Sequence, residues 1–126
     1  MIGSVLLGMT DPITTFRSQL PHHRLIAYQV AVELLLAVKA ASIRDTHLRD
    51  QAHRAAKSAC LNTAEGAGRV SRGDRARAFA IARGEAVEAV AGVEIAELTG
   101  DADAGATARC IPIAERLVAL LRGLTR

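Results

Sequence analysis

The sequence predicts an all-α protein, an antiparallel four-helix bundle in up-down-up-down order, and three observations lead to this prediction. Alanine and leucine dominate the 126 residues and aromatic residues make up only 2%, a composition that favours helices over sheets. Apolar residues recur at intervals of three and four in four successive segments. The connections between these segments are short and polar, and helices joined in this way pack as antiparallel neighbours.

The length of the chain indicates one domain. A domain of this size buries about two-thirds of its unfolded surface, so it needs neither a metal nor a disulfide to fold. Residues 1–20 have no sustained period and are expected to form a tail or an extended arm, followed by a bundle domain over residues 21–126. The apolar start lacks a basic region and is too short to span a bilayer, so we expect no signal peptide and a cytoplasmic location.

The first two helices are expected over about residues 21–42 and 48–67. Asp45 or Thr46 can cap the second helix. A Gly-Ala-Gly sequence at its end favours a left-handed stop. The helical stripe of the first segment comprises Leu25, Tyr28, Val32, Leu35, Leu36, Lys39 and Ile43.

The third helix is expected to open after Ser71. Ser71 and Asp74 have the spacing of a capping box, with Asp in place of the usual Glu or Gln. Leu98 and Gly100 are expected to close this helix. Its predicted apolar face comprises Ala76, Phe79, Ala80, Ala86, Val87, Val90 and Val93.

The fourth helix is expected to be capped by Asp101 or Asp103. Pro112 conflicts with a regular helix, because an internal proline costs about 3 kcal/mol and bends the helix. Either the helix is kinked at this proline, or residues 103–111 form a separate irregular turn. The apolar repeat of this segment comprises Ile113, Leu117, Leu120, Leu121 and Leu124.

The second helix carries a polar stripe beside an alanine-rich one, and Ser and Asn are weak mid-helix residues. We therefore expect this face to contact other protein. Arg54 is expected to pair with Glu88 or Glu65, since a partly buried charge is costly without a partner. The abundant alanine predicts a close approach of the second and third helices, and Gly84, Glu88 and Gly92 are expected to form a groove. The polar stripe comprises Gln51, Arg54, Ser58, Asn62 and Glu65.

The net charge of +3 is unevenly distributed. Basic residues exceed acidic ones between residues 44 and 83, and acidic residues exceed basic ones afterwards. A basic region of this kind can meet phosphate or an acidic partner, or its arginines can simply solvate helix faces. The chain has no standard nucleic-acid reader and no aromatic platform, so any binding is expected to be weakly specific and salt-sensitive. The candidate nucleic-acid contacts are Arg69, Arg72, Arg75 and Arg77.

The sequence offers no catalytic machinery, and we expect no catalytic residues, no metal site and no cofactor. A di-iron bundle needs Glu-x-x-His on two helices, whereas this chain has only Asp50-x-x-His53. Ser58 and Cys60 lie within a helix without a nucleophile elbow, and the glycine turn lacks the GK[ST] ending of a P-loop. Cys60 and Cys110 are expected to be free buried thiols, with a disulfide as the alternative.

Three blocks of residues follow one another along the chain. The first comprises Ala27, Tyr28, Gln29, Ala31, Glu33 and Leu34. The second comprises Gln51, Arg54, Ala55, Ala56, Ser58, Asn62, Thr63, Ala64, Glu65, Gly66, Gly68 and Arg69. The third comprises Phe79, Ala82, Arg83, Gly84 and Glu88, with Glu85 where serine is usual. Over about residues 25–124, these blocks resemble the signature of the 23S rRNA intervening-sequence proteins, also called four-helix bundle proteins.

This resemblance implies a four-helix bundle that assembles into homopentameric rings. A related branch, the accessory variability proteins of diversity-generating retroelements, is similar in fold and binds nucleic acid and a reverse transcriptase through a basic surface. By position, the resemblance implies a polar network of Arg54, Ser58, Asn62, Glu65 and Glu88, together with motif residues Gly66, Gly68, Arg69, Phe79 and Gly84. Glu85 departs from the pattern and puts negative charge where the family is small and neutral.

The sequence and the resemblance together predict a non-enzymatic, homo-oligomeric bundle that acts as an RNA- or DNA-associated accessory or scaffold. The alternative is a structural scaffold that binds another protein, such as a reverse transcriptase, with incidental arginines. A carboxylate-bridged metal enzyme is the third and least favoured class.

Overall fold

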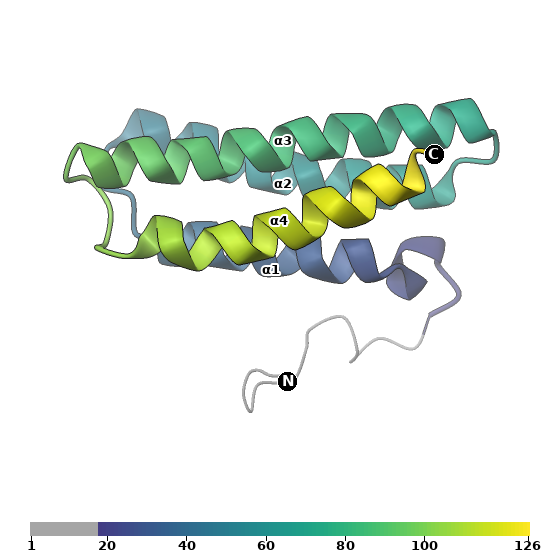
Figure 1. The fold of residues 1–126 in the computed structure, drawn as a ribbon, viewed down its shortest axis with the longest axis horizontal. Coiled ribbons are helices and arrows are strands. Elements are labelled where there is room, and N and C mark those ends of the chain that lie inside the picture. The colour runs from purple at the N-terminus through teal and green to yellow at the C-terminus, as the bar shows by residue number, and fades with distance from the viewer. Residues whose placement is uncertain (1–17) are drawn as a thin grey trace.

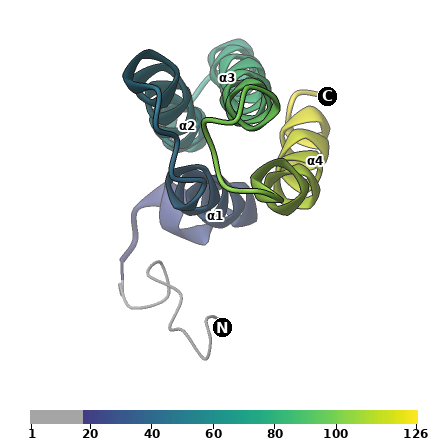
Figure 2. The ribbon, with the colours of Figure 1, turned by 90° about the vertical axis from the view of Figure 1, so that its left-hand side faces the viewer.

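The computed structural model describes residues 18–126, so most of the expected N-terminal arm lies outside the described residues. A short 3-10 helix, η1 (Pro21–Arg24), precedes the four α-helices of this range, which are α1 (Ile26–Ala40), α2 (Thr46–Gly68), α3 (Arg72–Leu98) and α4 (Ala106–Leu124). The helices run antiparallel in chain order (Figure 1) and enclose one core when seen end-on (Figure 2). The predicted all-α four-helix bundle is therefore confirmed.

The core combines alanines, mostly from α2 and α3, with larger side chains from α1, α3 and α4. Phe79 is the largest fully buried side chain. The fully buried aliphatic side chains include Val30, Leu34, Val38, Val93, Leu117 and Leu121. The alanines that α2 and α3 bury comprise Ala52, Ala55, Ala56, Ala59, Ala78, Ala82, Ala86, Ala89 and Ala96. As the alanine content predicts, α2 and α3 form the most extensive helix pair of the bundle.

Two glycines allow this close approach. A Cβ atom on Gly66 would lie 2.5 Å from Cε1 of Phe79, so the glycine forms the seat of the aromatic ring. A Cβ atom on Gly92 would lie 3.0 Å from the Cβ of Ala52. Gly84, in contrast, has open space beside it. The expected glycine groove on α3 therefore contacts α2 at Gly92, whereas no neighbouring atom lies beside Gly84.

The beginnings of α2 and α3 agree with the sequence. The carboxylate of Asp45 accepts a hydrogen bond from the Leu48 N–H at 3.0 Å, and the Ser71 hydroxyl accepts one from the Asp74 N–H at 3.1 Å. The end of α2 differs, because the helix runs through Gly68 and its C-cap, Arg69, is extended. The predicted left-handed stop is therefore wrong: the chain leaves α2 through the extended backbone of Arg69.

The first helix begins later than predicted. Residues 21–24 form η1, and Leu25 is extended, so the α-helix begins only at Ile26. The helix ends at Ala40, and Ser42 takes a positive φ of 54° in the turn that follows. Both boundaries depend on backbone conformations that apolar periodicity does not report.

The predicted cap of α4 is wrong. The N-cap is Gly105, with a φ of 84°. The carboxylate of Glu97, at the end of α3, accepts hydrogen bonds from the N–H groups of Gly105 and Thr107, each at 2.9 Å. A side chain from the neighbouring helix thus satisfies the donors that Asp101 or Asp103 was expected to satisfy.

Pro112 lies inside an unbroken α4, so the alternative of a separate irregular turn is wrong. Proline removes the hydrogen bond to the carbonyl of Ala108. Ala108 and Pro112 are both exposed, so this carbonyl lies on the side of the helix that faces water. None of the described helices is long and apolar enough to cross a bilayer. Cys60 and Cys110 are free and buried, as expected.

Candidate functional site

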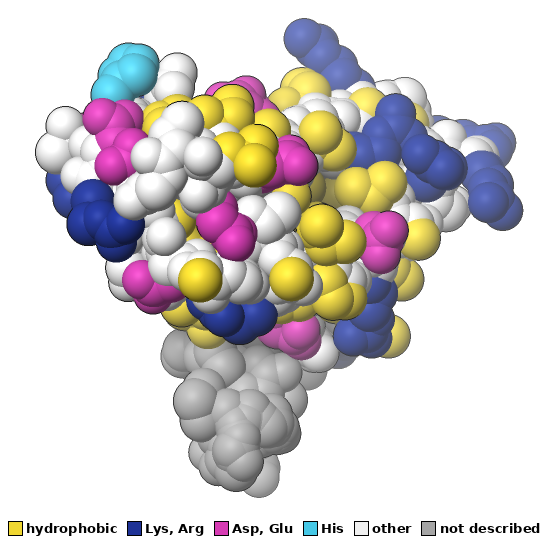
Figure 3. Space-filling model, turned by 60° about the vertical axis from the view of Figure 1, so that its left-hand side comes forward, with side chains coloured by type: hydrophobic (Ala, Val, Ile, Leu, Met, Phe, Trp, Pro, Cys, Tyr) yellow, Lys and Arg dark blue, Asp and Glu magenta, His cyan; other side chains and the backbone are white. Residues whose placement is uncertain are grey.

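Seven arginines of the chain lie at one end of the bundle. The α2–α3 turn, η1 and the C-terminal end of α4 lie at this end (Figure 1). Seen in space-filling form, Lys and Arg side chains gather towards it (Figure 3, right). We call it the basic end; its arginines are Arg24, Arg69, Arg72, Arg75, Arg77, Arg122 and Arg126, against the carboxylates of Glu65 and Asp74. All four predicted nucleic-acid contacts therefore lie in the region that has the highest positive charge.

Arg69 is engaged in an ion pair within its own helix turn. Its Nη2 atom lies 2.8 Å from Oε2 of Glu65, one helical turn earlier. The hydrogen bonds from Arg69 to this carboxylate raise the pKa of Arg69. Both side chains are about half exposed, so the pair contributes little to stability, but it offsets positive charge at the basic end.

Arg75 stabilises the α2–α3 turn. Its Nη1 atom donates to the carbonyl oxygens of Ala67 and Arg69, each at 3.3 Å. Its guanidinium group also lies 5.9 Å from the ring centre of Phe79, a distance suitable for a cation–π contact. These contacts satisfy carbonyls at the end of α2, so the first role of Arg75 is structural.

Arg72 and Arg77 are exposed and form no ion pair with a residue of the described range. Arg77 lies along a polar groove of about 420 Å³ between α2 and α3. This polar α2–α3 groove is lined by Asn62, Glu65, Arg69, Asp74, Arg77, Ala78 and Ile81. It brings family-motif residues of α2 beside two of the candidate arginines. Such a groove can hold an anionic group against arginine donors.

Within residues 18–126, the predicted polar network is reduced to two separate pairs. Asn62 donates through Nδ2 to the backbone oxygen and the hydroxyl of Ser58, at 2.9 and 3.0 Å. Glu65 pairs with Arg69 rather than with Arg54. Arg54 and Glu88 are exposed and make no ion pair within the described chain. Arg54 cannot reach Glu65 because eleven residues of helix separate them by about 16 Å.

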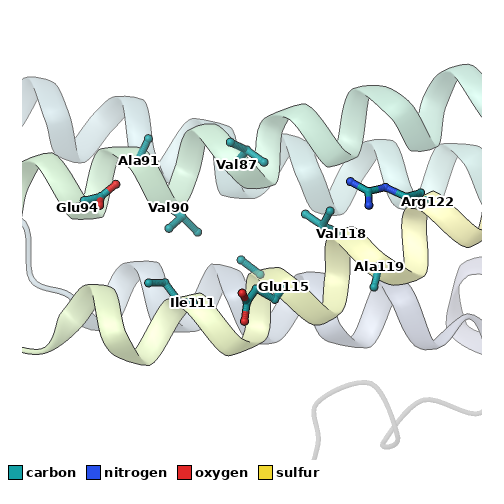
Figure 4. Close-up of a pocket in the computed structure, with 10 residues that line it drawn as sticks. Val87, Val90, Ala91, Glu94, Ile111, Glu115, Val118, Ala119 and Arg122 are labelled. Carbon is teal, nitrogen blue, oxygen red and sulfur yellow. The ribbon is translucent and has the colours of Figure 1, made fainter.

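Sequence reasoning missed a second feature, an apolar groove of about 380 Å³ between α3 and α4. Figure 4 shows valines from both helices lining it. We call this the α3–α4 groove; its lining residues are Val87, Val90, Ala91, Glu94, Ile111, Ala114, Glu115, Val118, Ala119 and Arg122. Val87 and Ala80 were predicted to face the core, but both are exposed, Val87 by 56%. The signal available in the sequence was that apolar residues occur on more than one face of α3.

Among the described residues, no group of three or more His, Cys, Asp or Glu side chains is placed to hold a metal ion. No curated protein matches the chain. Residues 23–123 match the model of a family described as 23S rRNA-intervening sequence protein. The chain therefore belongs to the 23S rRNA-intervening sequence protein family.

Proposed function

We propose that this protein is a non-enzymatic, homo-oligomeric scaffold whose basic end associates with the phosphate backbone of RNA or DNA. The observation that carries the proposal is a pair of exposed arginines at the basic end, Arg72 in the first turn of α3 and Arg77 beside the polar α2–α3 groove, neither with a carboxylate partner in the described chain. Cations of this kind bind phosphate and release the counterions of the nucleic acid.

Binding of this type has weak sequence preference. Base recognition requires side chains that stack on bases or read their edges. Phe79, the aromatic residue beside the α2–α3 turn, is fully buried in the core, whereas Arg69, Arg72 and Arg77 are exposed around this turn. We therefore expect the affinity to depend on salt and on the number of phosphates in reach, rather than on the order of the bases.

The test is a titration of a fluorescent RNA hairpin at several salt concentrations, with the mass of the complexes measured by light scattering. The double variant Arg72→Gln with Arg77→Gln is compared with Lys39→Gln with Arg116→Gln, which removes equal charge away from the basic end. We expect the first variant to weaken binding and to reduce the salt slope by up to about 2, one for each phosphate that an arginine no longer neutralises. Equal slopes for both variants would contradict a role for the basic end.

A protein-binding scaffold without a nucleic-acid role is the second candidate. Two observations favour it, because they occupy arginines within the chain: Arg69 forms an ion pair with Glu65, and Arg75 donates hydrogen bonds to backbone carbonyls. The same titration separates the two candidates. A discrete multimer that ignores the hairpin at every salt concentration would support the second.

A further inference from the structure

The outward surface of α3 is unusually apolar for a helix that faces water. Val87, Ile95 and Leu98 are exposed by 56, 48 and 80%. The exposed side of a surface helix is normally charged or polar, and here these apolar residues alternate with exposed charges such as Glu88 and Glu94. In the space-filling view, hydrophobic side chains extend over the face formed by α3 and α4, with carboxylates among them (Figure 3). The α3–α4 groove therefore has the composition of a surface that another chain covers.

The charges that line the α3–α4 groove follow an order along its length. From the basic end, α4 presents Arg122, then Val118, then Glu115 and finally Ile111 (Figure 4). Glu94 of α3 lines the groove together with these residues. None of the groove carboxylates forms an ion pair within residues 18–126. An occupant that fits would place a negative charge near the basic end, then an apolar side chain, then positive charges.

The outer face of α2 has the complementary order. From the basic end, it presents Glu65, which is paired with Arg69 within its own chain, then Leu61, then Lys57 and Arg54. Leu61 is 70% exposed, and Arg54 and Lys57 make no ion pair in the described structure. These residues recur at intervals of three and four, so they share one face of the helix.

The two series also match in length. Glu65 and Arg54 lie eleven residues apart on α2, and Arg122 and Ile111 lie eleven residues apart on α4. At 1.5 Å per residue, each series spans about 16 Å. Both helices end at the same end of the bundle (Figure 1), so the series pair in register when two copies of the chain point in the same direction.

We propose that the α3–α4 groove receives α2 of a second copy of this chain. Leu61 then packs against Val87 and Val118, Lys57 and Arg54 meet Glu115 and Glu94, and Glu65 approaches Arg122. The end-on view places α2 and α4 on opposite sides of the bundle (Figure 2), and the groove lies between α3 and α4. Each copy therefore offers one surface of each kind, and such head-to-tail contacts form a ring when the rotation closes. This inference rests on the proposed homo-oligomer and assigns its interface.

The experiment measures the light-scattering mass of the full-length protein over a range of concentrations. The variants are Lys57→Glu, Glu115→Lys and the double variant that carries both. Lys39→Glu, an exposed charge reversal on α1, serves as the matched control. Thermal unfolding monitored by circular dichroism confirms that each variant is folded, which we expect because the altered side chains are exposed.

We expect each single reversal to raise the concentration at which the multimer dissociates by at least about tenfold, because it sets like charges against each other. The double variant restores opposite charges across the contact and is expected to recover most of the wild-type mass. The control is expected to leave the mass unchanged.

Two results would overturn the inference in different ways. A multimer that resists both single reversals would show that the groove is not the contact, while the proposed homo-oligomer stands. If the wild-type protein were monomeric at every concentration, both the proposed homo-oligomer and its proposed interface would be wrong.

Discussion

On its α2 side, α3 packs through small residues, whereas towards α4 it leaves an open hollow lined by valines. Gly92 meets Ala52, and Phe79 lies on Gly66, so the backbones of α2 and α3 come close. The groove that remains between these two helices is polar. Val87 and Val90 line the α3–α4 groove without filling it. One helix can therefore be closely packed on one side and leave an open apolar groove on the other.

The largest effect is expected where the close packing of α2 and α3 is removed. Phe79→Ala deletes the largest fully buried side chain and should lower the free energy of unfolding by about 3–5 kcal/mol. Urea unfolding measures the change. A decrease of less than about 1 kcal/mol, which is typical of an average substitution, would show that the ring is not central to the α2–α3 packing.

A smaller decrease is expected when the seat of the ring is filled. The added Cβ of Gly66→Ala would lie 2.5 Å from Cε1 of Phe79, and overpacking of this kind costs about 1–3 kcal/mol. Gly68→Ala is the matched control, because nothing lies within 4 Å of its added Cβ. Alanine is the better helix former, so this control should be neutral or slightly stabilising by the same urea measurement. Equal decreases at both positions would contradict the proposed seat.

The junction between α3 and α4 depends on a cap rather than on small residues. Hydrogen bonds from Thr107 and from the Gly105 N–H lower the pKa of Glu97 from its ordinary 4.5 to about 2. Because the folded pKa is depressed, the carboxylate stabilises the fold fully above pH 4.5, and this contribution is lost as the pH falls towards 2. Melting temperatures of Glu97→Gln and wild type should thus differ at neutral pH and converge as the pH approaches the folded pKa. A constant difference over that range would contradict the role of the charge.

Substitutions in the groove should have the smallest effect on the stability of the fold. Val87→Ser alters a side chain that is more than half exposed, so the free energy of unfolding of one chain should change by less than about 0.5 kcal/mol. The mass of the multimer should nevertheless fall. Val70→Ser, at a valine that is 98% exposed in the α2–α3 turn, is the control that should leave both quantities unchanged. A fall in mass for both variants would show a general reduction of apolar surface rather than a specific interface.

The parts of the fold that depend on nearby residues could be predicted from the sequence. The caps at Asp45 and Ser71 act over three residues, and the structure has both. The cap of α4 could not be found in this way, because Glu97 lies eight and ten residues from the N–H groups that it binds. Glu97 reaches these N–H groups because α3 packs beside α4.

The candidate site was predicted less completely than the fold. The sequence places the four arginines in one region of the chain. It does not predict that Arg69 pairs with Glu65, or that Arg75 donates a hydrogen bond to a backbone carbonyl of the turn. The periodicity of α3 assigned Val87 to the core, because several faces of this helix are apolar and the sequence does not say which of them α4 covers. The α3–α4 groove forms because the packing of α4 against α3 leaves Val87 exposed.

The most direct test of the docking surface is a disulfide between copies. Leu61→Cys and Val118→Cys are combined in one full-length chain, oxidised mildly, and separated on a denaturing gel without reductant. Cys60 and Cys110 are buried, and burial raises the pKa of both thiols, so they should react slowly, as each single variant checks. We expect covalently linked chains for the double variant alone. A multimeric protein that gives no linked chains would contradict the assignment of α2 to the α3–α4 groove.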